Sequence, residues 1–210
     1  MSSQDGRESF SQIIRCGVKA SLGLHIAQPS FPKSVEVLAG WTENAASSAS
    51  TEEEKPFKIF FHPKDYESLS FMGRIEIFND GAHITYDRRL NACWRRFVIT
   101  KEICHILLFD HEAMTGTPQE VEQLIVEIMA GLPMFTANEG ANCDSYTMLM
   151  ALEILLPHHQ REKNNGKPAI EIARLYRVPE AWVRVYLSNW YKTLMDDCYA
   201  QEQVEAKAIA

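Results

Sequence analysis

Hydrophobic residues recur at helical spacing over most of the chain and at alternate positions over one short region. Residues 8–24 carry apolar side chains three or four positions apart, which predicts an amphipathic helix. Between about 57 and 86 the pattern changes to short aromatic or alternating runs around the turn signal Asp80-Gly81. These runs predict strands, with a hairpin at the turn and a small mixed or antiparallel sheet.

Helical periodicity returns at about residue 90 and continues to about 197. It predicts a long first helix of about 18 residues from Leu90, and a second that begins at the capping signal Thr117-Pro118. Further helices are expected over 139–156, 168–176 and 180–197, and the last two have the pattern of a helix-turn-helix or of any tight helical hairpin. The order predicts an α+β protein whose small N-terminal sheet packs on a largely helical domain.

The predicted domain organisation has three parts. Residues 1–55 form an N-terminal helix and an acidic, Ser-rich linker, in which the run from Asn44 to Glu54 is expected to be a solvated loop. Residues 56–200 form the main domain, with strands at about 57–86 and helices at about 90–197. Residues 201–210 are expected to be a flexible tail.

Composition narrows the class of protein. A net charge of −7 argues against an electrostatic nucleic-acid binder, which usually presents a basic face. The five cysteines are scattered and form no C-x-x-C pair, which favours reduced thiols in a cytoplasm. No apolar run approaches the roughly 20 residues that cross a bilayer, and the polar N-terminus is unlike a signal peptide. A soluble, cytoplasmic protein without a membrane partner is expected.

The candidate chemistry lies on the helix that follows the strands. Residues 101–105 are Lys-Glu-Ile-Cys-His, which matches H-E-x-x-H except that lysine replaces the first histidine. In that motif two imidazoles four residues apart on one helical face bind Zn²⁺, and the glutamate activates the bound water. Glu102 and His105 are therefore the candidate general base and metal ligand.

On both sides of this motif the chain resembles the ImmA/IrrE-type zinc metallopeptidases. Their first motif is roughly R-F-T-x-A-H-E-x-G-H and their second E-x-x-A-[ND]-x-F-A-x-x-L-L-M-P. The second motif aligns without a gap from its acid at Asp144 to its proline at Pro157. The resemblance covers about residues 57–190. It implies a zincin-like fold, peptide hydrolysis with Glu102 as general base, and zinc held by His105 and Asp144.

The departures from the family fall on the chemistry. Lys101 stands for the first zinc histidine, and a lysine is normally a cation with no lone pair to offer a metal. Cys104 stands for a glycine, and it lies about 100° around the helix from His105 and is not counted as a ligand. Asp144 stands for a longer glutamate, and Thr147-Met148 for A-[ND].

Three functions follow from this pattern. The favoured one is a metallopeptidase-like protein with a degraded zinc site, which acts as a non-catalytic binding or regulatory module and needs no cofactor. The second is an active zinc peptidase that uses His105, Asp144 and a substitute ligand such as His111 or His83. The third is a regulator that binds DNA through its helix-turn-helix-like segment. The resemblance also implies a protein partner, either a helix-turn-helix repressor or another protein.

A more specific hypothesis concerns the lysine itself. Lys101 lies one turn from His105, where its ammonium group takes the place of the metal and pairs with Asp144 or Glu102. Such a pair holds two helices together as zinc does elsewhere, although a buried ion pair is not automatically stabilising.

Overall fold

The computed structural model describes residues 3–48, 56–66, 72–108, 112–115 and 139–209, with side chains for 13–47, 56–66, 72–108 and 145–202. These residues form α-helices, strands and two short 3-10 helices. In chain order they are α1 (Ser3–Ala27), α2 (Val35–Ser48), β1 (Ile59–Lys64), β2 (Gly73–Phe78), β3 (Gly81–Asp87), α3 (Ala92–Leu107), β4 (Glu112–Thr115), α5 (Glu139–Leu155), η1 (His158–Gln160), η2 (Glu162–Asn164), α6 (Ala169–Tyr176), α7 (Glu180–Leu187) and α8 (Asn189–Ile209). The α+β class predicted from the sequence is confirmed.

The four described strands form one mixed sheet in the order β1-β3-β2-β4. β2 and β3 make the predicted antiparallel hairpin, and Gly81 at its turn has φ of +136°, a conformation that side-chain-bearing residues rarely adopt. β1 lies parallel to β3, and β4 lies antiparallel to β2. Pro63 is accommodated in β1 because this strand lies at the edge of the sheet.

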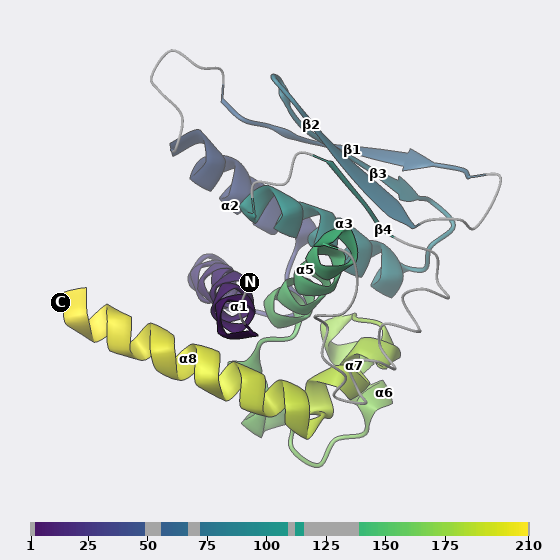
Figure 1. The fold of residues 1–210 in the computed structure, drawn as a ribbon. Helices are drawn as coiled ribbons and strands as arrows, with labels where there is room; N and C mark the ends of the chain where they lie inside the picture. The colour runs from purple at the N-terminus through teal and green to yellow at the C-terminus, as the bar shows by residue number, and fades with distance from the viewer. Residues whose placement is uncertain (1–2, 49–55, 67–71, 109–111, 116–138, 210) are drawn as a thin grey trace.

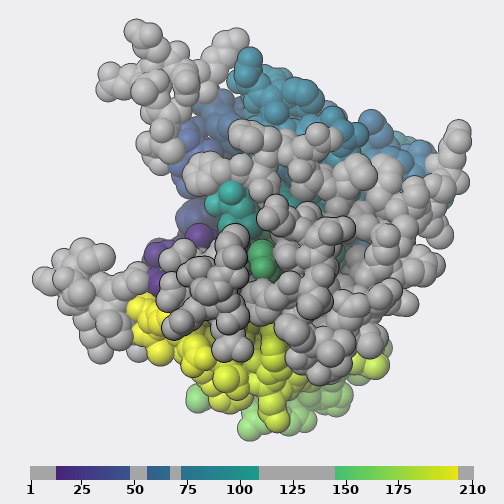
Figure 2. Space-filling view, viewed as in Figure 1, coloured from purple at the N-terminus to yellow at the C-terminus, as the bar shows by residue number. Residues whose placement is uncertain are grey.

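The helices cover one face of the sheet and continue away from it in layers (Figure 1). α3 packs on β2 and β3 and also contacts α2, while its other side contacts α5. α1 packs against α5 and α8, and the space-filling view shows the α1 and α8 surfaces adjoining (Figure 2). α3 is therefore central, and ten consecutive residues, Phe97 to Ile106, are buried.

Several predicted elements are confirmed at nearly the expected bounds. α3, α5 and α6 agree with the predicted helices from about 90, 139 and 168. The strand expected at residues 57–61 begins and ends later, as β1. β4 is an additional strand that the sequence did not predict. The helix expected after Thr117 lies outside the described residues.

The N-terminal region is more helical than predicted. α1 extends beyond the expected 8–24, and the loop expected from Asn44 is wrong as far as Ser48, because α2 continues to that residue. The side chain of Ser34 begins α2 by accepting hydrogen bonds from the N–H groups of Glu36 and Val37 at 3.2 and 3.4 Å. Packing stabilises the helix, since it buries residues at helical spacing: Val35, Leu38, Ala39 and Thr42.

The C-terminal region also differs from the prediction. The single helix expected over 180–197 is divided at Ser188, whose extended backbone ends α7. The Ser188 side chain then accepts a hydrogen bond from the N–H of Tyr191 at 3.1 Å, which caps the start of α8. α8 continues to Ile209, so the prediction that the last helix ends near 197 is wrong. Of the helices in the described residues, none is long and apolar enough to cross a membrane.

Candidate functional site

The turn between β3 and α3 positions the candidate helix. Asp87 ends β3 and accepts hydrogen bonds from the guanidinium of Arg89, with 2.6 Å between Arg89 Nη2 and Asp87 Oδ2. This contact lowers the pKa of Asp87 and holds the turn. Asn91 then caps α3, because its side-chain oxygen accepts from the N–H groups of Cys93 and Trp94, both at 3.0 Å.

Three polar side chains of α3 lie in the interior at the predicted site. Lys101 is 1% exposed, and Glu102 and His105 are fully buried. The ammonium nitrogen of Lys101 lies 3.4 Å from Oε1 of Glu102, so the two form a buried ion pair. Of the two partners expected for Lys101, the structure provides Glu102, while the side chain of Asp144 lies outside the described part of α5.

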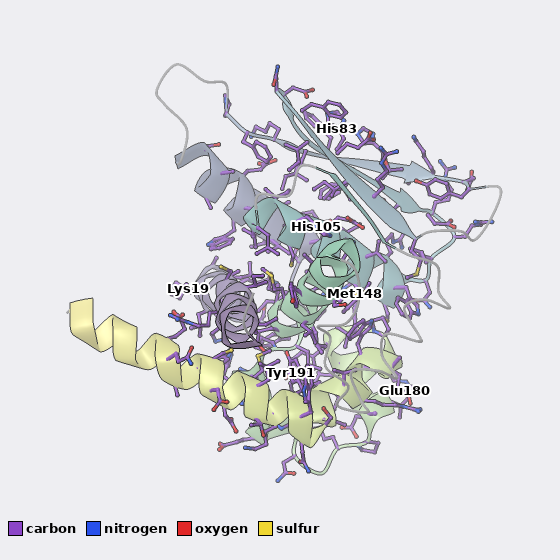
Figure 3. The ribbon with its side chains drawn as sticks, in the orientation of Figure 1. Lys19, His83, His105, Met148, Glu180 and Tyr191 are labelled. Atoms are coloured by element: carbon purple, nitrogen blue, oxygen red, sulfur yellow. The ribbon has the colours of Figure 1, made fainter. Side chains whose placement is uncertain are left out.

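His105 connects α3 to α5. Its Nε2 atom lies 3.3 Å from Oγ1 of Thr147, which is also fully buried. Figure 3 labels His105 on α3 and Met148, the residue after Thr147, on α5. Sequence reasoning noted Thr147 only as a departure from the family motif, yet this residue supplies a described polar contact between the two helices.

Glu102 faces the sheet as well as Lys101. A Cβ atom built on Gly73 of β2 would lie 2.4 Å from Val98 Cγ1 and 3.1 Å from Glu102 Oε1, so only glycine lets the strand approach α3 this closely. The half-buried phenol of Tyr66 lies near this carboxyl, and its pKa is raised by burial and by the carboxylates of Asp87 and Glu102. Sequence analysis singled out neither Gly73 nor Tyr66.

The remaining candidate ligands are placed differently. Burial raises the pKa of the Cys104 thiol well above its usual range, which keeps the thiol protonated and a poor ligand. His83 lies on the sheet face opposite α3, since Gly73, Ile75 and its partner Ile84 occupy the α3 face and side chains alternate along β3 (Figure 3). The prediction that His83 could serve as the substitute zinc ligand beside His105 is therefore wrong. His111 lies outside the described residues.

A metal at this site would have to use donors from more than the described side chains. Among those side chains, no group of three His, Cys, Asp or Glu residues is placed to hold an ion. The motif position that should supply the first imidazole supplies an ammonium group, which repels a cation. His105 is the one described member of the expected ligand set, and its Nε2 faces Thr147.

A second buried polar group, which sequence analysis did not identify, centres on Glu153 near the end of α5. This fully buried carboxyl accepts hydrogen bonds from the hydroxyls of Tyr199 at 2.6 Å and Tyr191 at 3.2 Å, and from the N–H of His158 at 3.0 Å. Burial raises its pKa to about 7. The available signal was an acid inside an otherwise apolar run, residues 148–156.

The helix-turn-helix-like segment forms two short helices, α6 and α7. Arg177 between them has φ of +52°, a left-handed conformation that ends α6. Trp182 and Val183 of α7 are fully buried. Arg184, on the exposed side of α7, pairs with Glu180 at 2.8 Å, so an acid accompanies this basic side chain.

No protein-family model matches this chain, and no curated protein is found to be similar to it.

Proposed function

We propose that this chain is a metallopeptidase-like protein of the ImmA/IrrE type with a degraded zinc site, and that it acts as a non-catalytic binding or transcription-regulatory module. The observation that carries the proposal is the buried ion pair between Lys101 and Glu102. It lies within the stretch that resembles the catalytic helix of that family.

The chemistry of the pair argues against hydrolysis. In a zinc peptidase the glutamate takes a proton from a metal-bound water, and the metal lowers the pKa of that water. Here the corresponding carboxyl of Glu102 is paired with an ammonium group 3.4 Å away. The cation sits next to the intended base and adds no open coordination position, so the arrangement supplies neither the activated water nor a place for it.

The same pair explains how the scaffold is retained without catalysis. Residues 97–106 of α3 are all buried, and a buried glutamate is costly unless a cation neutralises it. Lys101 supplies that cation from the same turn of helix, while His105 and Thr147 connect α3 to α5. With this helix packing retained, the protein can still bind a protein partner through its surface. The resemblance to the family implies such a partner.

The zinc content of the purified protein tests the proposal. Elemental analysis of the wild-type chain is expected to find far less than one zinc per chain. Lys101→His restores the H-E-x-x-H pattern and is expected to raise zinc binding, whereas Lys19→His, an exposed control on α1, is not. One zinc per wild-type chain would overturn the proposal and favour the active peptidase. Salt-dependent binding to duplex DNA would favour the DNA-binding alternative instead.

A further inference from the structure

A group of basic side chains lies away from α3, where the end of α1, the connection 28–34 and the short helices η1 and η2 meet. Its centre is Lys33, a lysine that is only 1% exposed. The Lys33 ammonium donates to the main-chain carbonyl of Gln28 and to Nδ1 of His25, which lies 3.2 Å away. The ammonium nitrogen also lies 4.3 Å from the centre of the Phe31 ring.

His159 of η1 lies beside His25, with 4.8 Å between the two ring centres. The hydroxyl of Tyr199 donates to Glu153, so its oxygen accepts the proton on His159 Nδ1, which is 3.4 Å away. Nε2 of the neutral ring therefore carries the lone pair. That atom is buried and has no hydrogen-bond partner within the described residues.

The charged groups around the two imidazoles are predominantly basic. Burial lowers the pKa of both rings, to about 4 for His159, and Lys33 and the exposed Lys163 lower both pKa values further. His158, the other titratable group of η1, pairs with Asp196 at 2.8 Å. Glu153 reaches His159 only through the hydroxyl of Tyr199.

Capping explains part of this arrangement. Gln28 follows the last residue of α1, and a lysine that donates to its carbonyl stabilises the negative end of that helix. An exposed lysine would serve the same purpose. Capping accounts neither for the full burial of Lys33 nor for two adjacent imidazoles, one with a buried nitrogen that lacks a partner.

We propose that His25, Lys33, His159 and Lys163 form a binding site for a phosphate-type oxyanion. His25 accepts from Lys33 at Nδ1, so its Nε2–H can donate to the anion, and His159 adds a positive charge when its Nε2 takes up a proton. The partly exposed ring of His25 and the exposed Lys163 meet the anion from solvent, while the buried Nε2 of His159 and the buried ammonium of Lys33 supply positive charge behind them. Phosphate fits because its several acceptor oxygens and its negative charge match the His25 donor and the basic groups of α1, the connection 28–34, η1 and η2.

Histidine NMR titration of the full-length protein tests this site with inorganic phosphate as the probe. Phosphate is expected to raise the pKa of His25 and His159 saturably relative to chloride at equal ionic strength, because an anion favours the protonated rings. The resonances of His62 and His83, on the exposed face of the sheet, serve as internal controls. A response no larger than that to chloride overturns the proposal.

Two variants separate binding from structural effects. Lys33→Met keeps the apolar stem and is expected to weaken phosphate binding about tenfold or more, whereas Lys19→Met, at an exposed position of α1, is expected to leave it unchanged. His159→Gln keeps the Lys33 cap and is expected to reduce the tightening of binding on acidification, which then depends on His25 alone of the two rings. Wild-type affinity in folded Lys33→Met, or unchanged pH dependence in His159→Gln, overturns the assignment. Phenyl phosphate distinguishes two kinds of natural ligand. Tighter binding than inorganic phosphate indicates that the site binds a phosphorylated molecule, and weaker binding indicates that it binds the free ion.

Discussion

Removing one partner of the Lys101–Glu102 pair should destabilise the protein far more than removing both. At 3.4 Å and an effective dielectric constant of about 20, two unit charges attract by about 5 kcal/mol. Lys101→Met leaves the Glu102 carboxylate buried without that attraction, and the expected loss is about 3–5 kcal/mol. Glu102→Gln leaves the ammonium buried in the same way. In the double variant neither charge remains, and the loss is expected to be smaller than in either single variant, which corresponds to a coupling energy of at least about 3 kcal/mol.

Urea unfolding followed by tryptophan fluorescence measures these free energies for the wild type, the two single variants and the double variant. A matched control is the exposed pair Arg184 and Glu180 on α7, which are closer together, at 2.8 Å, but open to solvent. Its double-mutant cycle is expected to give only about 0.3–0.5 kcal/mol. If the losses at Lys101 and Glu102 simply add to within about 0.5 kcal/mol, the pair is not coupled and the reasoning is refuted.

Three further predictions concern packing and pH. The raised pKa of Glu153, about 7 against 4.5, corresponds to about 3 kcal/mol of stability that is present below pH 4.5 and lost as the pH rises through 7. Glu153→Gln should therefore gain stability relative to wild type between pH 5 and 8 by urea unfolding, and a pH-independent difference would contradict this. Gly73→Ala should cost about 1–3 kcal/mol because its Cβ meets Val98, whereas Gly40→Ala, with open space in α2, should be neutral or stabilising in thermal unfolding. The lowered pKa of His159 means that stability is lost as the pH falls below 6.5 towards 4, and His159→Gln should lessen that loss.

The local pattern of residue types predicted secondary structure best for elements that form without contacts to distant parts of the chain. The Asp80-Gly81 turn specified the β2–β3 hairpin, since its backbone conformation is a property of those residues. The apolar periods before and after it specified α3 and α5. α2 was missed because its N-terminal half has a short apolar stripe and its C-terminal half is small and polar, so packing on α3 was needed to reveal it.

The candidate site, too, could be predicted from the sequence only in part. The sequence by itself determined that Lys101, Glu102 and His105 share about one turn of a helix, because 3.6 residues complete a turn. It did not determine that this turn is buried on every side, since the burial depends on the sheet, α2 and α5 packing around α3.

Only the tertiary structure decided which groups these residues meet. It brought Thr147 to His105 across two helices and Gly73 to Glu102 from the sheet, and it left His83 on the opposite face. It likewise gathered His25, Lys33 and His159 from three separated segments. The physical reason is that hydrophobic periodicity specifies which side of an element is buried, whereas the neighbour on that side depends on how the whole chain packs.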